Sequence, residues 1–228
     1  MKLGILFSGG KDSTYSAYIM QRQNYELACL ITMKSINKAS YMFQSAGVEM
    51  VELQAQAMGL PLVIGETAGE KEKELIDLEK TIKIAKEKYK LDGIVSGALF
   101  STYQRDRIEK ICDKLGLKIF APLWHKSQEE EMKELLQHGF KFILSAVAAE
   151  GLDKNWLNRT ITMKDVEQLI VLNKKVGLNV AGEGGEFESM VLDCPLFKKM
   201  IGLEEVEMVE ENKNAVYLVI KKAKLVGK

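Results

Sequence analysis

The fold of this chain is decided by the stretch Leu3-Gly4-Ile5-Leu6-Phe7-Ser8-Gly9-Gly10-Lys11-Asp12-Ser13. Its apolar part, Leu3–Phe7, predicts a strand, and the helix-compatible residues Thr14–Met20 predict a helix. The paired glycines between them let backbone N–H groups approach an anion, a new helix directs its positive dipole end there, and Lys11 adds a full positive charge. The stretch therefore predicts a phosphate site between a strand and a helix.

Two widespread phosphate motifs do not fit this stretch. A Walker A loop needs G-x-x-x-x-G-K-[ST], but Ile5 stands at the first glycine position and Asp12 follows Lys11. The dinucleotide fingerprint G-x-G-x-x-G finds no matching spacing here either. A tight turn capped by Ser or Asp is the remaining alternative, yet a turn alone does not require a lysine between Gly-Gly and Asp-Ser. We therefore interpret Ser8–Ser13 as a phosphate-binding loop.

Composition predicts a globular protein with no strong electrostatic preference. Hydrophobic residues make up 46% of the 228 residues, which suffices for the core of one large domain or two small ones. Lys plus Arg and Asp plus Glu both number 32, so no overall attraction to nucleic acid is expected, although a local basic patch stays open. The sequence shows neither a signal peptide nor a run of transmembrane length. We expect a cytoplasmic protein without membrane association.

The three cysteines, Cys29, Cys112 and Cys194, lie far apart and form no C-x-x-C pair. This spacing indicates neither a disulfide framework nor a zinc or iron–sulfur site. Reduced, mostly buried thiols are the expectation.

The first half of the chain alternates strand-like and helix-like segments. Apolar residues recur at helical spacing between Leu75 and Tyr89, and the charge run Glu70–Glu74 before them is interpreted as a solvated face. Ser101 with Gln104 predicts a capping box for a helix that Gly116 ends. Such alternation is typical of a parallel sheet covered by helices. Five strands are predicted, at Leu3–Phe7, Leu27–Met33, Leu60–Ile64, Gly93–Gly97 and Leu117–Ala121.

The regular alternation stops after Pro122. A capping box at Ser127 with Glu130 predicts a helix that ends near His138, and Thr162 with Asp165 can cap a second helix. The predicted strands of this half are Phe140–Val147 and a hairpin of Val206–Val209 and Ala215–Lys221, joined by Glu210–Asn214. The sequence thus predicts an α/β nucleotide-binding domain over residues 1–123 with a Rossmann-like, five-stranded parallel sheet, and a smaller C-terminal α+β domain over residues 124–228.

A second chemical cluster is the segment Gly182-Glu183-Gly184-Gly185-Glu186-Phe187-Glu188-Ser189. Three carboxylates this close together repel one another unless a cation or a hydrogen-bond donor lies among them. They have the chemistry to bind Mg²⁺, to hold ammonia or an ammonium group, to orient a substrate amine, or to act as a general base. An acidic, hydrated loop is the alternative, but glycines flanked by Glu and followed by an aromatic residue favour a shaped backbone.

The motif S-G-G-K-D-S resembles the pyrophosphate loop of the N-type ATP pyrophosphatases, or PP-loop enzymes, which cleave ATP to AMP and pyrophosphate while they adenylate a substrate. Over nearly its full length the chain further resembles the diphthine ammonia ligase family within that superfamily. Gly184 and Glu188 depart from the Asn- and His-containing loop of relatives associated with cobamide salvage, which favours the diphthamide branch. The residues that carry the family resemblance are Asn37, Ser40–Met42, Gly69–Glu72, Ser96–Ala98, Tyr103–Arg105, Arg107, Pro122–Trp124, Val147–Leu152 and Gly182–Ser189.

The resemblance implies a fold of the adenine nucleotide alpha hydrolase type and the last step of diphthamide synthesis. In that step ATP activates the carboxylate of diphthine on translation elongation factor 2, and ammonia displaces AMP. The implied phosphate ligands are Ser8, Gly9, Gly10, Lys11 and Ser13, with Asp12 as the Mg²⁺ ligand. The residues implied to take part in the reaction are Lys11, Asp12, Glu186 and Glu188, and those implied to contact substrate are Tyr103, Glu150, Glu183, Gly184, Gly185, Glu186 and Glu188.

Gly97, Gln104 and Arg107 are further candidates for nucleotide contact. They follow the fourth predicted strand, and open α/β sheets bind their ligands beyond the carboxyl ends of strands. Helix capping by Gln104 and a surface ion pair for Arg107 are equally good interpretations of the last two.

Three other functions stay open. A tRNA-thiolating enzyme would share the superfamily, but such enzymes commonly use paired cysteines. A non-catalytic ATP-binding sensor is a second alternative, because a nucleotide-binding fold does not by itself imply turnover. Amidation of a small molecule such as a cobamide precursor is the third. No glutaminase domain is recognisable, so free ammonium is the simpler nitrogen donor, and the sequence leaves open whether the chain forms a homo-oligomer.

Overall fold

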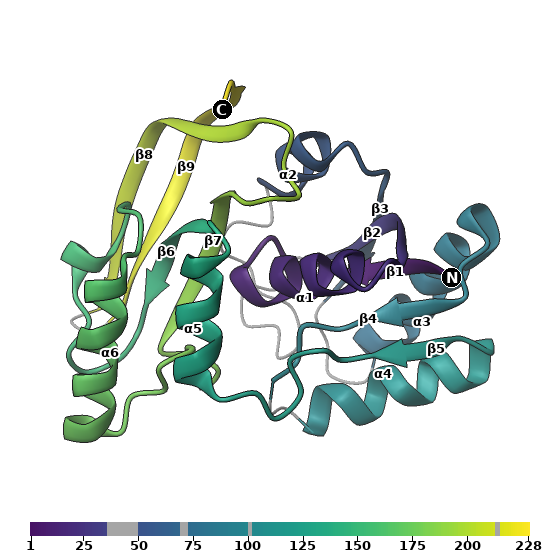
Figure 1. Cartoon of the computed structure of the whole chain (residues 1–228), viewed down its shortest axis with the longest axis horizontal. Coiled ribbons are helices and arrows are strands. Elements are labelled where there is room, and N and C mark those ends of the chain that lie inside the picture. The colour runs from purple at the N-terminus through teal and green to yellow at the C-terminus, as the bar shows by residue number, and fades with distance from the viewer. Residues whose placement is uncertain (36–49, 69–72, 100–101, 213–214) are drawn as a thin grey trace. The chain divides into compact units, whose positions relative to one another are not determined.

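The computed structural model describes residues 1–35, 50–68, 73–99, 102–212 and 215–228, which form two compact units, Met1–Trp124 and His125–Lys228 (Figure 1). Several residues of the family resemblance, and one capping residue, lie outside this description. They are Asn37, Ser40–Met42, Gly69–Glu72 and Ser101, together with the side chains of Tyr103 and Gln104.

The first unit is built on a parallel sheet of five strands in the order β3-β2-β1-β4-β5. All five predicted strands are present, with bounds that differ by a few residues. Because β2 and β3 lie on one side of β1 and β4 and β5 on the other, the strand order reverses between β1 and β4. The strands are β1 Lys2–Leu6, β2 Glu26–Ser35, β3 Leu62–Thr67, β4 Gly93–Val95 and β5 Lys118–Phe120.

Helices cover this sheet. They are α1 Lys11–Arg22, α2 Val51–Met58, α3 Lys73–Tyr89 and α4 Thr102–Leu115. Ile31 of β2, Leu78 and Ile82 of α3 and Ile108 of α4 belong to one buried apolar cluster, so α3 and α4 share a face of the sheet. Leu30, whose side chain points to the other face, is buried as well. The predicted parallel sheet covered by helices is confirmed, and both of its faces are buried.

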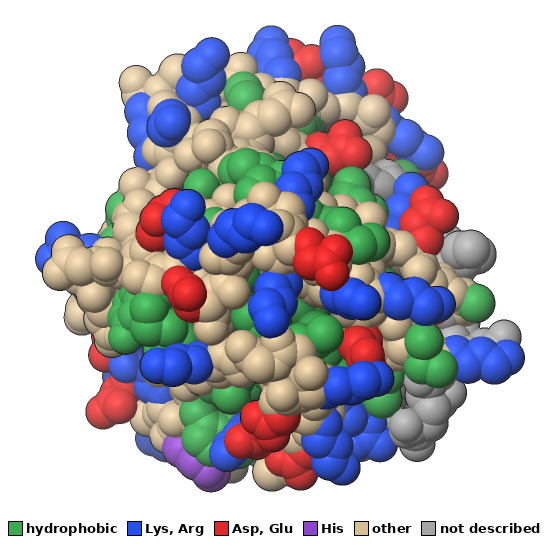
Figure 2. Space-filling model, turned by 90° about the vertical axis from the view of Figure 1, so that its right-hand side faces the viewer, with side chains coloured by type: hydrophobic (Ala, Val, Ile, Leu, Met, Phe, Trp, Pro, Cys, Tyr) green, Lys and Arg blue, Asp and Glu red, His purple; other side chains and the backbone are tan. Residues whose placement is uncertain are grey.

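The prediction of a solvated charge run before α3 is wrong at Glu74, which is 1% exposed in the first turn of that helix. The outer surface of α3 is mixed, with ion pairs such as Lys114–Glu79 at 2.6 Å and with exposed Ile84. Figure 2 shows Lys and Arg side chains interspersed with Asp and Glu on one face of the molecule, with small apolar patches between them.

The second unit contains an antiparallel sheet of four strands in the order β7-β6-β9-β8. The predicted hairpin is confirmed, but residues 210–212, predicted as its connection, continue β8. Strand β7 was not predicted, because its sequence was assigned to the acidic loop. The elements are α5 Gln128–Gln137, β6 Lys141–Val147, the short 3-10 helix Lys154–Trp156, α6 Met163–Val176, β7 Phe187–Asp193, β8 Met200–Asn212 and β9 Ala215–Val226.

At the predicted capping residues, α6 has both bonds of a capping box and α5 has the bond that Ser127 accepts. Ser127 Oγ accepts the Glu130 N–H over 3.5 Å at the start of α5. At the start of α6, Asp165 Oδ2 accepts the Thr162 N–H over 2.8 Å, and its Oδ1 accepts from Arg159 over 2.7 Å. Burial acts to raise the pKa of Asp165, but the hydrogen bonds from Thr162 and Arg159 outweigh it and hold this pKa below its ordinary value.

All three cysteines are free and buried, as predicted. Burial raises the pKa of each thiol, Cys29, Cys112 and Cys194, to about 12. Within the described ranges, no helix combines the length and the apolar character that crossing a membrane requires.

Candidate functional site

The loop after β1 requires a glycine. Gly9 has a φ of +80°, and a Cβ on it would collide with the side chain of Gln54. Gln54 is fully buried on α2 and donates from Nε2 to the Gly9 carbonyl oxygen over 2.8 Å. Neither this φ nor this space suits a larger residue. The turn and the buried amide together fix the path of the backbone into α1.

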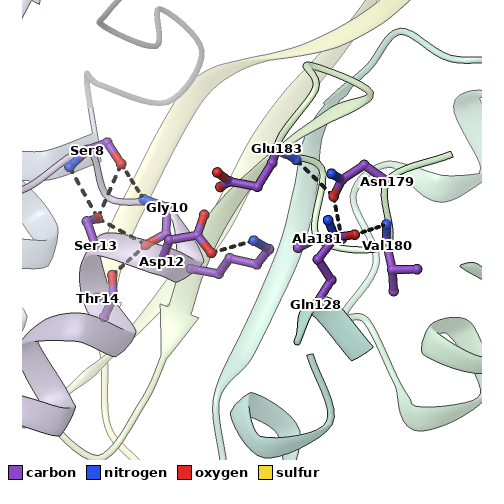
Figure 3. A network of polar contacts seen from close by, with 11 residues as sticks. Ser8, Gly10, Asp12, Ser13, Thr14, Gln128, Asn179, Val180, Ala181 and Glu183 are labelled. Atoms are coloured by element: carbon purple, nitrogen blue, oxygen red, sulfur yellow. Dashed lines mark hydrogen bonds and ion pairs between the residues drawn. The ribbon is translucent and has the colours of Figure 1, made fainter. Parts of the chain in front are cut away.

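Hydroxyl groups tie the same loop to the first turn of α1 (Figure 3). Ser13 Oγ and Thr14 Oγ1 both donate to the Gly10 carbonyl oxygen, over 3.2 and 2.8 Å. Ser13 Oγ also lies 3.2 Å from Ser8 Oγ. Gly10 caps α1 without a side-chain hydrogen bond. Since the first N–H groups of a helix have no intrahelical acceptor, this end of α1 has the donors that an anion requires.

Lys11 and Asp12 place opposite charges side by side at the start of α1. Lys11 Nζ lies 2.5 Å from Asp12 Oδ1, and the side chains are 1% and 24% exposed. A buried ammonium group needs an anionic partner, which the Asp12 carboxylate supplies. A phosphate has the charge to replace that partner, which would release the carboxylate for a cation.

Gly97 lies against the first turn of α1. A Cβ on Gly97 would come 2.8 Å from the backbone nitrogen of Ser13 and 3.0 Å from the carbonyl carbon of Asp12. Gly97 follows β4, which pairs in parallel with β1, so the carboxyl ends of the two strands meet. Open α/β sheets bind their ligands where the strand order reverses, which in this sheet is between β1 and β4. The structure therefore brings Gly97 together with the predicted phosphate loop.

Helix α4 carries three more of the predicted residues. The side chains of Tyr103 and Gln104 lie outside the description, and Arg107 is half-buried. The neighbouring Arg105 stacks over the ring of Trp124, with its guanidinium carbon 4.6 Å from the ring centre. Arg105 thus has a packing role, whereas nucleotide contact by Gln104 and Arg107 stays a prediction.

Glu186 closes the acidic loop of the second unit on itself. Its Oε1 accepts the Asn179 N–H over 3.1 Å, and its Oε2 accepts the Gly184 N–H over 2.8 Å. The carbonyl oxygen of Glu186 in turn accepts the Ala148 N–H over 2.8 Å. A carboxylate that receives two main-chain donors is held in one orientation. The geometry gives Glu186 a part in shaping the loop, where the sequence predicted a part in the reaction.

The other predicted residues of this unit gather where β6 ends and β7 begins. Glu150 is exposed in the turn after β6, and β6 pairs with β7, which carries Glu188. Glu183 and Glu188 are half-buried, whereas Gly184 and Gly185 between them are exposed. Strand pairing thus brings the predicted substrate residues of the second unit to one end of its sheet.

Three amide side chains that shape these two loops were not predicted. Besides Gln54, they are Asn179, whose Oδ1 accepts the Ala181 and Glu183 N–H groups, and Gln128, whose Oε1 accepts the Val180 N–H (Figure 3). A signal existed for Asn179, because Asn often caps the backbone two residues further on. No local pattern shows that a helical glutamine is buried.

Magnesium fits the first loop as a partner of bound phosphates. In the part of the chain that the structure describes, no three His, Cys, Asp or Glu side chains come together to hold a metal ion. Mg²⁺ commonly binds through one or two carboxylates together with substrate phosphates. The half-buried carboxylate of Asp12 suits such a donor set.

Two family models match the chain, one over each unit. The Diphthamide synthase N-terminal domain matches residues 1–119, and the Diphthamide synthase C-terminal domain matches residues 127–226. Together the two matches cover most of the 228 residues.

Individual proteins are similar over most of the chain. The diphthine–ammonia ligase of Mus musculus is 36% identical over 94% of this chain and 87% of its own length. That of Schizosaccharomyces pombe is 37% identical over 97% of this chain but only 39% of its own length. A solved structure, a predicted subunit of tRNA methyltransferase from Methanocaldococcus jannaschii, is 17% identical with a TM-score of 0.44, over 86% of this chain and 98% of its own. The family models and the relatives show that this chain belongs to the diphthamide synthase family.

Proposed function

We propose that this chain is a diphthine–ammonia ligase that uses ATP to convert the diphthine carboxylate on translation elongation factor 2 into an amide. The observation that carries the proposal is the loop Ser8–Ser13, which lies where the strand order of the sheet reverses. The chain with this loop is 36% identical, over 94% of the chain, to a protein named diphthine–ammonia ligase. AMP and pyrophosphate are the proposed products.

The chemistry takes two steps. A carboxylate is a poor electrophile, so one of its oxygens first attacks the α-phosphorus of ATP, and pyrophosphate leaves. The nitrogen of ammonia then attacks the carbonyl carbon of the acyl adenylate, and AMP leaves with the bonding electron pair while a proton is lost from nitrogen. The protein has to neutralise phosphate charge and align the reacting groups.

In the first unit, the loop residues Ser8, Gly9, Gly10, Lys11 and Ser13 hold the phosphates. The donors at the start of α1 and the buried Lys11 ammonium support this assignment. Asp12, whose half-buried carboxylate lies beside Lys11, would hold Mg²⁺, which would neutralise phosphate charge when bound. Gly97, Gln104 and Arg107 complete the nucleotide site.

The second unit supplies the residues that handle diphthine and ammonia. Glu183, Glu188 and Glu150 are the carboxylates proposed to meet them, because they gather at one end of the sheet. Glu186 is assigned to the loop structure, because both of its carboxylate oxygens accept main-chain N–H groups. Free ammonium is the proposed nitrogen donor and the cytoplasm the proposed location.

The decisive experiment mixes the protein with diphthine-bearing elongation factor 2, ATP, Mg²⁺ and ammonium. Mass spectrometry of the elongation factor should show conversion of the carboxylic acid to the amide, with AMP and pyrophosphate formed in equal amounts. Amidation of a small acid without amidation of the elongation factor would overturn the substrate assignment. Tight ATP binding without AMP would overturn the ligase assignment.

Lys11→Ala should abolish AMP release in that assay, because the buried ammonium group beside the phosphates is lost. Lys114→Ala is a suitable control, since the exposed Lys114 forms an ion pair with Glu79 and has no place in the proposed site. Near-normal turnover by Lys11→Ala would rule out the proposed phosphate site.

A further inference from the structure

The loop between α6 and β7 uses every backbone N–H group from Asn179 to Gly185 within its own unit. Five of these seven groups donate to side-chain oxygens, of Gln128, Asn179 or Glu186, and two donate to carbonyl oxygens of the loop. A glycine-rich loop that binds phosphate needs N–H groups that point outward. This loop is therefore not a second phosphate-binding loop, although it contains three glycines as such loops often do.

Asn179 is the centre of this arrangement (Figure 3). Its Oδ1 accepts two N–H groups, from Ala181 over 3.0 Å and from Glu183 over 3.2 Å. Its own N–H donates to Glu186 over 3.1 Å, and its carbonyl oxygen accepts the Gly182 N–H over 3.0 Å. One residue thus takes part in four of the hydrogen bonds that define the loop.

The bond from Glu183 determines where that residue points. Because Asn179 Oδ1 accepts the Glu183 N–H, it restrains the backbone at Glu183 and with it the direction in which the Glu183 side chain leaves the main chain. The Glu183 carboxylate extends away from the Asn179 side chain (Figure 3). Loss of the Asn179 acceptor would release two N–H groups of a half-buried loop, which would then rearrange to find other acceptors.

We propose that Asn179 is a positioning residue for the amide-forming step, acting through the backbone of Ala181 and Glu183 to orient the Glu183 carboxylate. The inference rests on the proposed function and narrows it, because it gives Glu183 the contact with ammonia, which enters only in the second step. Asn179 itself touches no reacting atom. Its contribution depends on one chemical property of its side chain, an acceptor oxygen at the δ position.

That property permits a matched pair of variants. Asn179→Asp keeps an acceptor oxygen at the δ position, and a carboxylate accepts main-chain N–H groups at least as well as an amide. Asn179→Leu has nearly the same size and no acceptor. Asp165→Asn provides a stability control, because it removes hydrogen bonds from the cap of α6 in the same unit without touching the loop.

The kinetic test separates the two chemical steps. Exchange of pyrophosphate into ATP reports adenylation, and mass spectrometry reports amide formation. Asn179→Leu should lower amide formation by about tenfold or more while adenylation changes by less than about twofold, because only the second step needs the positioned carboxylate. Asn179→Asp should restore most of the amide formation. An equal loss in both steps, or no rescue by Asp, would overturn the proposal.

A second measurement tests the geometry without any substrate. Hydrogen exchange at the Ala181 and Glu183 amides should be fast in Asn179→Leu and slow in the wild type and in Asn179→Asp. Unchanged protection in the Leu variant would refute the proposed role even if its kinetics changed. If instead the wild type forms no amide on elongation factor 2 but the exchange results hold, the proposed function has failed and the role of Asn179 in the loop stands.

Discussion

Gly97 and Ser13 approach each other so closely that no side chain fits between them: a Cβ on Gly97 would lie 2.8 Å from the Ser13 backbone nitrogen. The two residues follow neighbouring parallel strands, β4 and β1, and are 84 positions apart in the sequence, the difference between 97 and 13. This approach joins the carboxyl end of β4 to the first turn of α1, whose N–H groups are the proposed phosphate donors.

Gly97→Ala should therefore impair ATP cleavage. The added methyl group meets backbone atoms, which cannot rotate away as a side chain would, so the first turn of α1 has to shift. We expect pyrophosphate release to fall about 10- to 100-fold, because a reacting group misplaced by about 1 Å can slow a reaction by up to about 100-fold. Gly227→Ala is the matched control, because a Cβ there meets nothing within 4 Å, and it should leave the rate unchanged. Equal rates for the two variants would mean that the close approach does not matter for the site.

Gln54→Leu tests the buried amide beneath the same loop. Loss of the 2.8 Å bond from Nε2 leaves the Gly9 carbonyl oxygen without that donor, which should lower the free energy of unfolding by about 1–3 kcal/mol and raise the KM for ATP. Urea unfolding and steady-state kinetics measure the two effects. Gln56→Leu, at an exposed position two residues further along α2, should change stability by no more than about 0.5 kcal/mol. Similar losses in both variants would argue against a specific role for Gln54.

The sheet of the first unit was predictable because its strands are short apolar runs separated by helical periods. The five predicted strands and the helices around Leu78 and Ile108 all appear. Helix α2 was not predicted, since Val51–Met58 is short and its apolar and polar residues alternate over Val51–Ala57, a period typical of a strand and not of a helix. Strand β7 was missed for a different reason: its first residues, Phe187 and Glu188, also belong to a segment rich in carboxylates and glycine.

The site was predictable where a single local segment carries it, and less so where distant residues build it. Ser8–Ser13 forms a loop with the glycine geometry that its sequence indicates. The supports of that loop, Gln54 and Gly97, come from other elements, and their approach depends on the tertiary fold. Glu186 shows the same limit. Its position among carboxylates and glycines predicted a part in the reaction, whereas in the structure both of its carboxylate oxygens accept main-chain N–H groups.

The thiols should be inert in the folded protein. Burial raises the pKa of Cys29, Cys112 and Cys194 to about 12, so the thiolate fraction near neutral pH is on the order of one in a hundred thousand. Iodoacetamide should leave all three unmodified under native conditions and alkylate all three in urea, as read by intact mass. Modification of a native cysteine at the rate of a free thiol would contradict the burial of that residue.

Asp165→Asn should destabilise the protein in a pH-dependent way. The hydrogen bonds from Thr162 and Arg159 lower the pKa of Asp165 below its ordinary value of 3.8, despite its burial, so the ionised form is bound more tightly in the folded state. A group with a lowered folded-state pKa adds stability above its unfolded-state pKa and loses it as the pH falls through the folded-state value.

At neutral pH the Asp165→Asn variant should lose about 1–2 kcal/mol of unfolding free energy, as expected for a lost cap. Urea unfolding should show this difference shrinking as the pH falls below 3.8. Glu167→Gln removes a charge from an exposed position of the same helix and is the matched control, which should change stability by no more than about 0.5 kcal/mol at neutral pH. A difference between wild type and Asp165→Asn that stays constant down to acidic pH would refute the assigned cause.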